Sequence, residues 1–303
     1  MAEKTLLKSE GQQLESFLEE LQREQQIKEI TGWETGFPRL SRALDGILPG
    51  LYLLIGPPAV GKTSFAKQFL DQVANHNTVP GVFFTFAERT KELRIKTLAR
   101  LSGLENREIR RGSAYLLHWY GVPKAQQTDA DDLSPGWDKV KKSAEEARPW
   151  LDLTYIIECS GKTDLRRIEE QILEVESVKG MDCVMVVIDD CQRLRNIEQK
   201  PTDRIASVVD ELQRAAVSLQ IPILAVCPAL LEDRYNLPQI WSDRVPSADV
   251  ILVMEVDLEQ TKKLTEPNQV ITLNIVKNRG GERGILAFEF YPPFARFVET
   301  AQR

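Results

Sequence analysis

The segment Gly56 to Ser64, GPPAVGKTS, holds residue types that bind phosphate. It satisfies the GxxxxGKT/S spacing (Walker A), in which a glycine-rich backbone turns its N–H groups toward phosphate oxygens beside a helix N-terminus. Lys62 is expected to neutralise β- and γ-phosphate oxygens, and the Thr63 hydroxyl to ligate Mg²⁺. An apolar run precedes the segment and the helical run SFAKQFLDQVA follows it. The predicted nucleoside triphosphate site consists of Gly56, Pro57, Pro58, Ala59, Val60, Gly61, Lys62, Thr63 and Ser64.

Two further apolar runs end in acids. VMVVIDD ends at Asp189 and Asp190, and we predict that Asp189 joins Thr63 at the metal, at the tip of a strand next to the P-loop strand, because an unpartnered acid is costly there. Asp190 is interpreted as a helix cap or a solvated neighbour. GVFFTFAERT ends at Glu88, a candidate base or water-orienting group on the same sheet edge. The alternative for Glu88 is a solvated acid that opens the following helix.

Other reactive residue types predict structure rather than chemistry. A second GKT, which ends at Thr163, has no glycine five positions earlier, so we expect a loop in which Thr163 caps the helix that follows. The two histidines, His76 and His118, are too few and too far apart for a metal site or a His-based triad. Four cysteines stand singly, mostly inside apolar runs, and are predicted to be reduced core residues: Cys159, Cys183, Cys191 and Cys227.

The elements that must position these residues follow from the apolar pattern. Short apolar runs rich in β-branched residues alternate with helical stretches, which favours a mainly parallel sheet covered by helices on both faces. Residues 249–299 instead read as consecutive strands with a turn at Gly280-Gly281, typical of an antiparallel hairpin at the sheet edge. Residues 121–148 predict a loop followed by a surface helix. The fold class is therefore α/β, built on the runs LYLLIG, GVFFTFAE, LDLTYIIEC, DCVMVVIDD, IPILAVC, DVILVMEV and VITLNIVKN.

Residues 1–30 form a separate, polar segment before the α/β domain of residues 31–303. An apolar stripe with helical spacing runs along it: Leu14, Phe17, Leu18 and Leu21. One short helix does not bury such a stripe alone, so it must dock either on its own chain or on a neighbour.

Size and composition bound the class of protein. A chain of 303 residues with 42% hydrophobic and 28% charged residues fits one globular α/β domain with a short appendage. There is no 18-residue apolar run and no signal-peptide core, so we expect a cytoplasmic protein without a membrane partner. A net charge of −6 argues against a strongly basic nucleic-acid binder but leaves room for a locally basic channel.

A family resemblance rests on these motifs. ITGWETGFPRLSRALDGILPGLYLLIGPPAVGKTSF resembles the beginning of the ATPase domain of DnaB-type replicative helicases and of their RecA and KaiC relatives. The likeness continues in order through GVFFTFAERTKELRIKTLARLSGL, DCVMVVIDDCQRL and VKNRGGERGILAFEFYPPFARFVE, over about residues 31–299.

The resemblance implies a RecA-like P-loop ATPase core that uses ATP and Mg²⁺ and assembles into a homo-oligomeric ring, usually a hexamer, with nucleotide at each subunit interface. It adds Gln192 to the nucleotide site. It implies that Lys277 and Arg279 reach a neighbour's γ-phosphate, where a cation stabilises transition-state charge only in the assembled ring. Without the family, two basic residues near a turn are commonly solvated. The N-terminal helix resembles the linker helix that docks on an adjacent subunit.

The sequence also departs from the family. Where a typical helicase has a Ser-Gln pair that couples the γ-phosphate to DNA-binding loops, this chain has Cys227-Pro228, and neither side chain replaces an amide. The loop after it is shorter than the helicase counterpart. Glu88 stands one position beyond the helicase acid, at which this chain has Ala87, although Glu88 suits the RecA-like placement.

Three functions are compatible with these features. The first is a motor that hydrolyses ATP and moves along single-stranded DNA as a helicase or translocase, gripping phosphates with Arg234 and Arg244, which are otherwise ordinary solvated residues. The second is a KaiC-like or accessory ATPase whose nucleotide state controls oligomerisation and partner binding, an alternative that Cys227-Pro228 favours. The third, a non-hydrolysing structural ring, is disfavoured by Walker A, Asp189 and Glu88 together.

Overall fold

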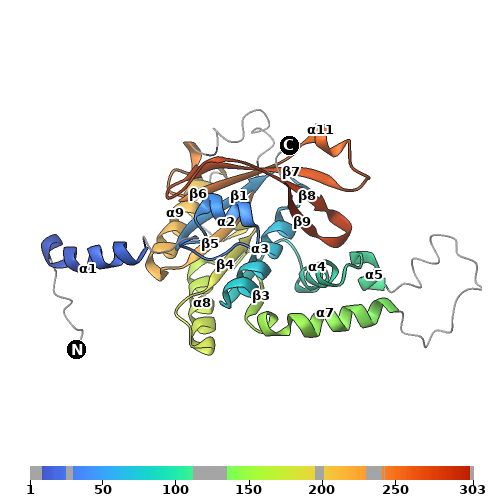
Figure 1. Ribbon diagram of the computed structural model, residues 1–303, viewed down its shortest axis with the longest axis horizontal. Coiled ribbons are helices and arrows are strands. Elements are labelled where there is room, and N and C mark those ends of the chain that lie inside the picture. Colours follow the sequence, from blue (N-terminus) through green and yellow to red (C-terminus); the bar gives the residue numbers. More distant parts are fainter. Residues whose placement is uncertain are drawn as a thin grey trace, which may run out of the picture.

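The computed structural model describes residues 9–24, 30–111, 135–194, 201–229, 241 and 243–300. Its centre is a nine-stranded sheet in the order β3-β2-β4-β5-β1-β6-β7-β8-β9 (Figure 1). The strands are β1 (Gly50–Gly56), β2 (Gly81–Thr85), β3 (Thr154–Glu158), β4 (Met185–Asp189), β5 (Pro222–Pro228), β6 (Val250–Val256), β7 (Gln269–Asn278), β8 (Gly284–Tyr291) and β9 (Arg296–Thr300).

The sheet is parallel from β3 to β6 and antiparallel from β6 to β9. The predicted α/β class with a C-terminal antiparallel run is confirmed, and Gly280 and Gly281 lie between β7 and β8 as expected. The antiparallel part extends to four strands because β6 and β9 join the hairpin. Parallel pairing places the carboxyl ends of β1, β2, β4 and β5 at one edge.

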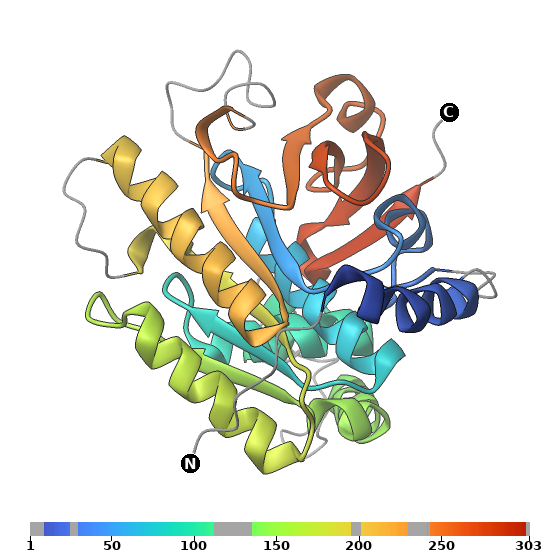
Figure 2. The ribbon, with the colours of Figure 1, turned by 90° about the vertical axis from the view of Figure 1, so that its left-hand side faces the viewer.

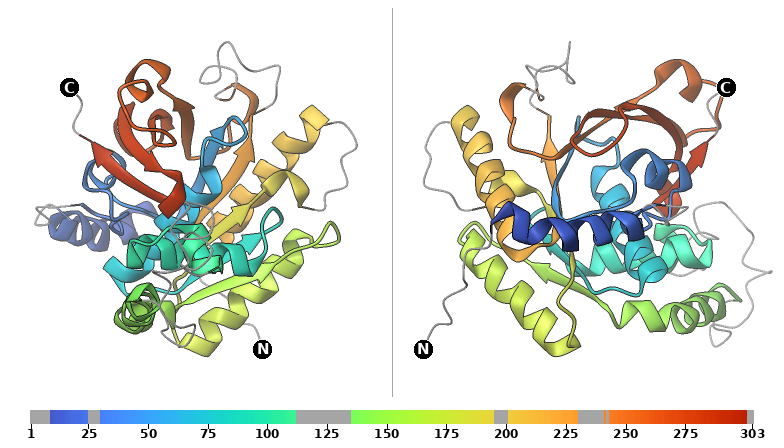
Figure 3. Two further views of the ribbon diagram at one scale, coloured as in Figure 1. Left: turned by 90° about the vertical axis from the view of Figure 1, so that its right-hand side faces the viewer. Right: turned by 60° about the vertical axis from the view of Figure 1, so that its left-hand side comes forward.

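Helices cover both faces of the sheet (Figure 2 and Figure 3). One face packs on α2 (Pro38–Leu44), α3 (Lys62–Asn77) and α4 (Thr90–Ser102), through an aromatic cluster that includes Phe65 and Phe288. The other packs on α8 (Leu165–Lys179) and α9 (Pro201–Leu219) through aliphatic side chains. The remaining helices are α1 (Glu10–Glu24), α5 (Asn106–Arg111), α7 (Pro135–Leu151), α11 (Leu258–Thr261) and the short 3₁₀ helices η2 (Cys191–Arg193) and η4 (Pro292–Phe294).

Helix α1 projects from the body of the molecule (Figure 1). Its Leu14, Phe17 and Leu18 side chains are about half exposed, so the described part of the chain does not bury the apolar stripe. The helix expected within 121–148 is found as α7, whereas the loop expected before it lies mostly outside the described residues. Among the residues described, no helix combines the length and apolar character that a membrane crossing requires.

Two local predictions are wrong. The first concerns helix α8, which is capped by Asp164 rather than by Thr163. The Asp164 carboxylate accepts a hydrogen bond from the Arg167 backbone N–H, because the Thr163 hydroxyl closes the preceding turn by accepting from the Ser160 N–H.

The second concerns the cysteines. Cys191 and Cys227 are not reduced core residues but form a disulfide, while Cys159 and Cys183 are free. The pair is separated by 36 positions in sequence, and it meets because β4 and β5 are neighbouring strands whose ends lie side by side.

Candidate nucleotide site

The loop between β1 and α3 has the backbone shape of a phosphate-binding turn. Ala59 and Gly61 both have positive φ, at 65° and 94°. A Cβ at Gly61 would lie 2.9 Å from the rings of Phe290 and Phe297, so this position requires glycine for packing as well as for conformation. The first turn of α3 then begins with the Phe65 N–H donating to the Gly61 carbonyl.

Lys62 lies over this loop. Its ammonium donates to the carbonyl oxygens of Gly56 at 2.8 Å and Pro57 at 2.7 Å. Burial lowers the pKa of Lys62, and the negative charges of Asp189 and Asp190 oppose that shift. An ammonium held this way is positioned for anionic oxygens, which would satisfy it better than neutral carbonyls.

The residues predicted to hold the metal meet directly. The Thr63 hydroxyl donates to Asp189 Oδ2 at 2.7 Å. The pKa of Asp189 is raised to about 6, mainly by burial, with smaller upward contributions from the nearby carboxylates Asp190 and Glu88 and a downward contribution from the Thr63 hydrogen bond. A buried carboxylate with a raised pKa beside a hydroxyl is the donor set that a divalent cation completes, so these residues fit Mg²⁺.

The strand that carries Asp189 is not next to the P-loop strand. Strand β5 lies between β4 and β1, so that expectation is wrong. The contact still forms because Asp189 pairs with Val226 at the carboxyl end of β5, and the P-loop residues that follow β1 reach the same edge.

Glu88 lies at this edge too, after the end of β2. Its backbone is fixed by a reciprocal pair of hydrogen bonds with the Thr85 hydroxyl. Its Oε1 pairs with the Lys96 ammonium at 2.5 Å, and its Oε2 is buried without a hydrogen-bond partner in the described chain. Glu88 is therefore neither freely solvated nor fully satisfied, and an orphaned acceptor near Asp189 is placed to accept from a water molecule. Sequence reasoning missed Lys96, which lies eight positions after Glu88 in sequence.

Lys277 and Arg279 lie at the opposite end of the sheet. Lys277 donates to the Pro246 carbonyl, and the Arg279 guanidinium pairs with Asp249 at 2.9 Å. Asp249 also accepts from the Leu51 N–H at the start of β1. At about 3.3 Å per residue, the seven-residue β1 puts about 20 Å between this end and the chain's own P-loop. The two cations do not belong to the phosphate site of their own subunit.

Sequence comparison places the chain among known proteins. Residues 32–299 match the family described as DnaB-like helicase C terminal domain. The chain belongs to this family. It is 26% identical over 285 residues to the replicative DNA helicase DnaB of Pasteurella multocida, covering 90% of this chain and 56% of that protein. With DnaB of Haemophilus influenzae the identity is 25% over 322 residues, with coverage of 100% and 64%. The chain thus spans somewhat over half the length of these relatives.

Structural comparison supports the same fold. A DnaB-like replicative helicase, solved to describe its interactions with primase, superposes with a TM-score of 0.76 at 19% identity, covering 96% of this chain and 68% of that one. A KaiC-like protein from Pyrococcus horikoshii OT3 gives 0.54 at 18% identity, with coverage of 88% and 98%. The RecA-like core of the DnaB-like family is confirmed, and with it a nucleotide-binding ATPase domain.

The departure of this DnaB-like chain at Cys227-Pro228 takes a definite structural form. Cys227 is joined to Cys191, the residue that follows the Asp189-Asp190 pair. The Gln192 side chain donates to the Pro228 carbonyl at 3.0 Å, and Asp190 caps η2 by accepting from the Gln192 N–H, which agrees with the cap interpretation of Asp190. Where the sequence pattern of the helicases has a polar pair, this chain has a covalent link between two strand ends.

Of the two arginines considered for DNA contact, the structure describes only Arg244. Arg234 lies outside the described residues. The Arg244 guanidinium lies over the Trp241 ring, 5.4 Å from its centroid, which orders its side chain by a cation–π contact.

Proposed function

We propose that this chain is an ATP-hydrolysing subunit of a DnaB-like ring that moves along single-stranded DNA as a helicase or translocase. The observation that carries the proposal is the 2.7 Å hydrogen bond from Thr63 to Asp189, which joins the predicted phosphate loop and the predicted metal carboxylate beside Lys62. The matched family and the relatives named as replicative helicases support the same function.

Each residue of the site has a defined task. Backbone N–H groups of 56–64 and the Lys62 ammonium bind and orient the triphosphate. Thr63 and Asp189 hold Mg²⁺, which supplies neutralisation of charge on the phosphate oxygens. Glu88 holds the attacking water through its free Oε2 and accepts its proton, while Lys96 keeps the carboxylate oriented. Gln192, which the family resemblance adds to the nucleotide site, is held in place by its hydrogen bond to the Pro228 carbonyl.

The proposal of a ring is supported by the two cations at the far end of the sheet. Lys277 and Arg279 lie about 20 Å from their own phosphate loop, so they serve a γ-phosphate only on an adjacent copy. The half-exposed stripe of α1 supplies an apolar contact for the same neighbour. A homohexamer with nucleotide at each interface satisfies both features.

The direct test is ATP turnover by the full chain with and without single-stranded DNA, over a series of salt concentrations. We expect a several-fold stimulation that falls steeply with salt, because phosphate contacts release counterions. Lys62→Ala sets the background, and Lys262→Ala, on an exposed helix end, is the matched control. Turnover that ignores DNA at every salt concentration would contradict the motor.

A second function is favoured by one observation, the covalent Cys191–Cys227 link at the position of the helicase polar pair. A switch ATPase of KaiC-like type would bind nucleotide, change its oligomeric state and leave DNA aside. Sizing the protein with and without a non-hydrolysable ATP analogue distinguishes the two. Assembly that depends on the analogue, together with turnover indifferent to DNA, would establish the switch.

A further inference from the structure

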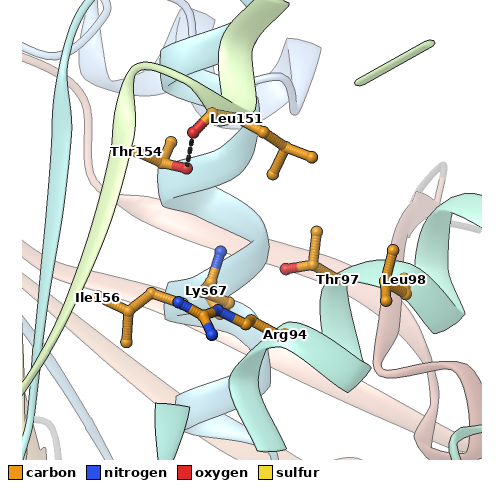
Figure 4. A pocket seen from close by; sticks show the side chains of 7 residues that line it. All are labelled: Lys67, Arg94, Thr97, Leu98, Leu151, Thr154 and Ile156. Atoms are coloured by element: carbon orange, nitrogen blue, oxygen red, sulfur yellow. Dashed lines mark hydrogen bonds between the residues drawn. The ribbon is translucent and has the colours of Figure 1, made fainter. Parts of the chain in front are cut away.

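A cavity of about 310 Å³ opens between α3, α4 and the edge strand β3, away from the phosphate loop (Figure 4). Lys67 of α3 and Arg94 of α4 lie in its middle. Ile156 stands on one side, Leu98 on the other, and Leu151 across one end. On α4, Arg94 and Leu98 are four residues apart and so share a face. This volume is at the lower end of what small-ligand pockets have.

Two residues that line the cavity, Lys67 and Thr97, belong to a buried cluster with an excess of positive charge. Lys67 is 1% exposed, and its ammonium pairs with Asp71, which is 3% exposed. The same carboxylate also pairs with the guanidinium of Arg100, which is 9% exposed, and accepts from the Thr97 hydroxyl at 2.9 Å. Two buried cations therefore share one carboxylate. Arg94, an exposed residue that also lines the cavity, adds a further positive charge.

Hydrogen-bond donors in this cluster also exceed acceptors. An ammonium has three donors, and in the described chain Lys67 uses one, toward Asp71. Arg100 Nη1 is buried without a partner among the described residues. Burial lowers the pKa of both Lys67 and Arg100, and their contacts with Asp71 oppose that shift. A buried donor or charge left this way costs free energy until an acceptor anion arrives.

The walls select the kind of anion. Leu98, Leu151 and Ile156 form apolar surface around the cations, and the hydroxyls of Thr97 and Thr154 add polar atoms at the lining. A bare phosphate or sulfate would leave the apolar surface uncovered, whereas a carboxylate on a short hydrocarbon chain satisfies both parts.

We propose that this cavity is a binding site for a small organic monoanion, a carboxylate with a short apolar chain, whose oxygens are held by Lys67 and Arg94. The site is separate from the nucleotide site. It bridges α3, which begins at Lys62, and α4, whose Lys96 holds Glu88. Occupation therefore ties together the two helices that carry a phosphate-binding lysine and the partner of the candidate base, and we expect it to change ATP turnover.

The experiment titrates the full chain with pentanoate by calorimetry and by ligand-observed NMR. We expect saturable binding, with pentanamide, the neutral isostere, not binding. Arg94→Ala should weaken the affinity at least about tenfold, because a charge-assisted contact is removed at an exposed position where folding is not at risk. Leu98→Trp should abolish binding by filling the cavity. Arg166→Ala, which removes an exposed arginine on α8, is the matched control and should bind as the parent does.

Lys62→Ala separates this site from the phosphate loop, since pentanoate should bind it as tightly as it binds the parent. Loss of binding in that variant would assign the anion to the loop and overturn the proposal. Equal affinity in the parent, Arg94→Ala and Leu98→Trp would overturn it too, as would the absence of saturable binding to the parent. None of these outcomes depends on whether the chain hydrolyses ATP or responds to DNA.

Discussion

The two ends of strand β1 differ in how many residues of the proposed site one chain supplies. We call the carboxyl end, where these residues converge within one chain, the complete end, and the other the incomplete end. At the carboxyl end, Lys62, Thr63 and Asp189 converge within a single subunit. At the other end, Arg279 and Lys277 contact only a carboxylate and a carbonyl among the described residues of their own chain, about 20 Å from that site. On the proposed function, the first end binds nucleotide within one chain, and the second end acts on the nucleotide of another copy. The difference teaches that nucleotide binding should be separable by mutation from the step that needs a neighbouring copy, because Lys277 and Arg279 lie at the end of the sheet opposite to the phosphate loop.

Arg279→Ala tests the incomplete end and should have the largest effect. We expect ATP hydrolysis to fall by about 10³-fold or more, as when an arginine finger is lost, while nucleotide affinity stays unchanged. The fold should tolerate the change, because an ion pair with a 63% exposed arginine contributes only about 0–1 kcal/mol. Arg283→Ala, in the same turn, is the control.

Mixing Arg279→Ala with Lys62→Ala subunits sharpens this test. Each variant alone should be inactive, but at mixed interfaces an intact Lys62 meets an intact Arg279 from the neighbour. Steady-state turnover of the mixture should therefore exceed that of either variant. A mixture no more active than its parts, or an Arg279→Ala protein with full activity, would remove the role in trans.

Glu88→Gln tests the complete end. Hydrolysis should fall by about 10²–10⁴-fold because an amide does not accept the proton of the attacking water. ATP affinity, measured with the analogue, should be retained because Glu88 contacts Lys96 rather than the phosphate loop. The control is Glu92→Gln, which removes a comparable carboxylate that pairs with Arg110 on the surface. Parallel losses in both variants would point to a structural effect on α4.

The Cys191–Cys227 link gives the next largest effect. Reduction, or Cys227→Ser, should lower the free energy of unfolding by about 2–4 kcal/mol, because the link closes a long loop in the unfolded chain. Denaturant unfolding with and without reductant measures the loss, and Cys159→Ser, which removes a free cysteine, serves as control. Four titratable thiols in the unfolded, unreduced protein would contradict the link.

Local sequence patterns predicted the strands, the phosphate loop and the acids at strand ends, because each depends on neighbouring residues. The Walker A spacing identifies Lys62 and Thr63 without a structure, and the apolar run before Asp189 marks a strand end. What the sequence did not reveal depends on strand order. The place of β5 between β4 and β1, and the meeting of Cys191 with Cys227, arise from crossovers that no local pattern records. Lys96 was missed for a different reason, since its contact with Glu88 depends on how the following helix α4 packs back on the end of β2.

Asp189→Asn tests whether the buried carboxylate at the complete end lowers the free energy of unfolding. Burial raises the pKa of Asp189 from 3.8 to about 6, so the folded state binds a proton more tightly than the unfolded state does. The free energy of unfolding of the parent therefore falls as pH rises from about 4 to about 6. It stays at the lowered value above that pH. Asn removes the charge and can still accept from Thr63, so the variant should be more stable by about 1–3 kcal/mol at pH 7 to 8.

The gap between variant and parent should shrink as pH falls through about 6 and vanish near about 4, measured by denaturant unfolding at each pH. Asp138→Asn, an exposed acid on α7, should stay within about 0.5 kcal/mol of the parent throughout. Mg²⁺ with nucleotide should stabilise the parent but not Asp189→Asn, and the variant should lose hydrolysis. An Asp189→Asn protein less stable than the parent at pH 8 would show that the carboxylate supports the fold, and the two ends of β1 would then not differ in the way proposed.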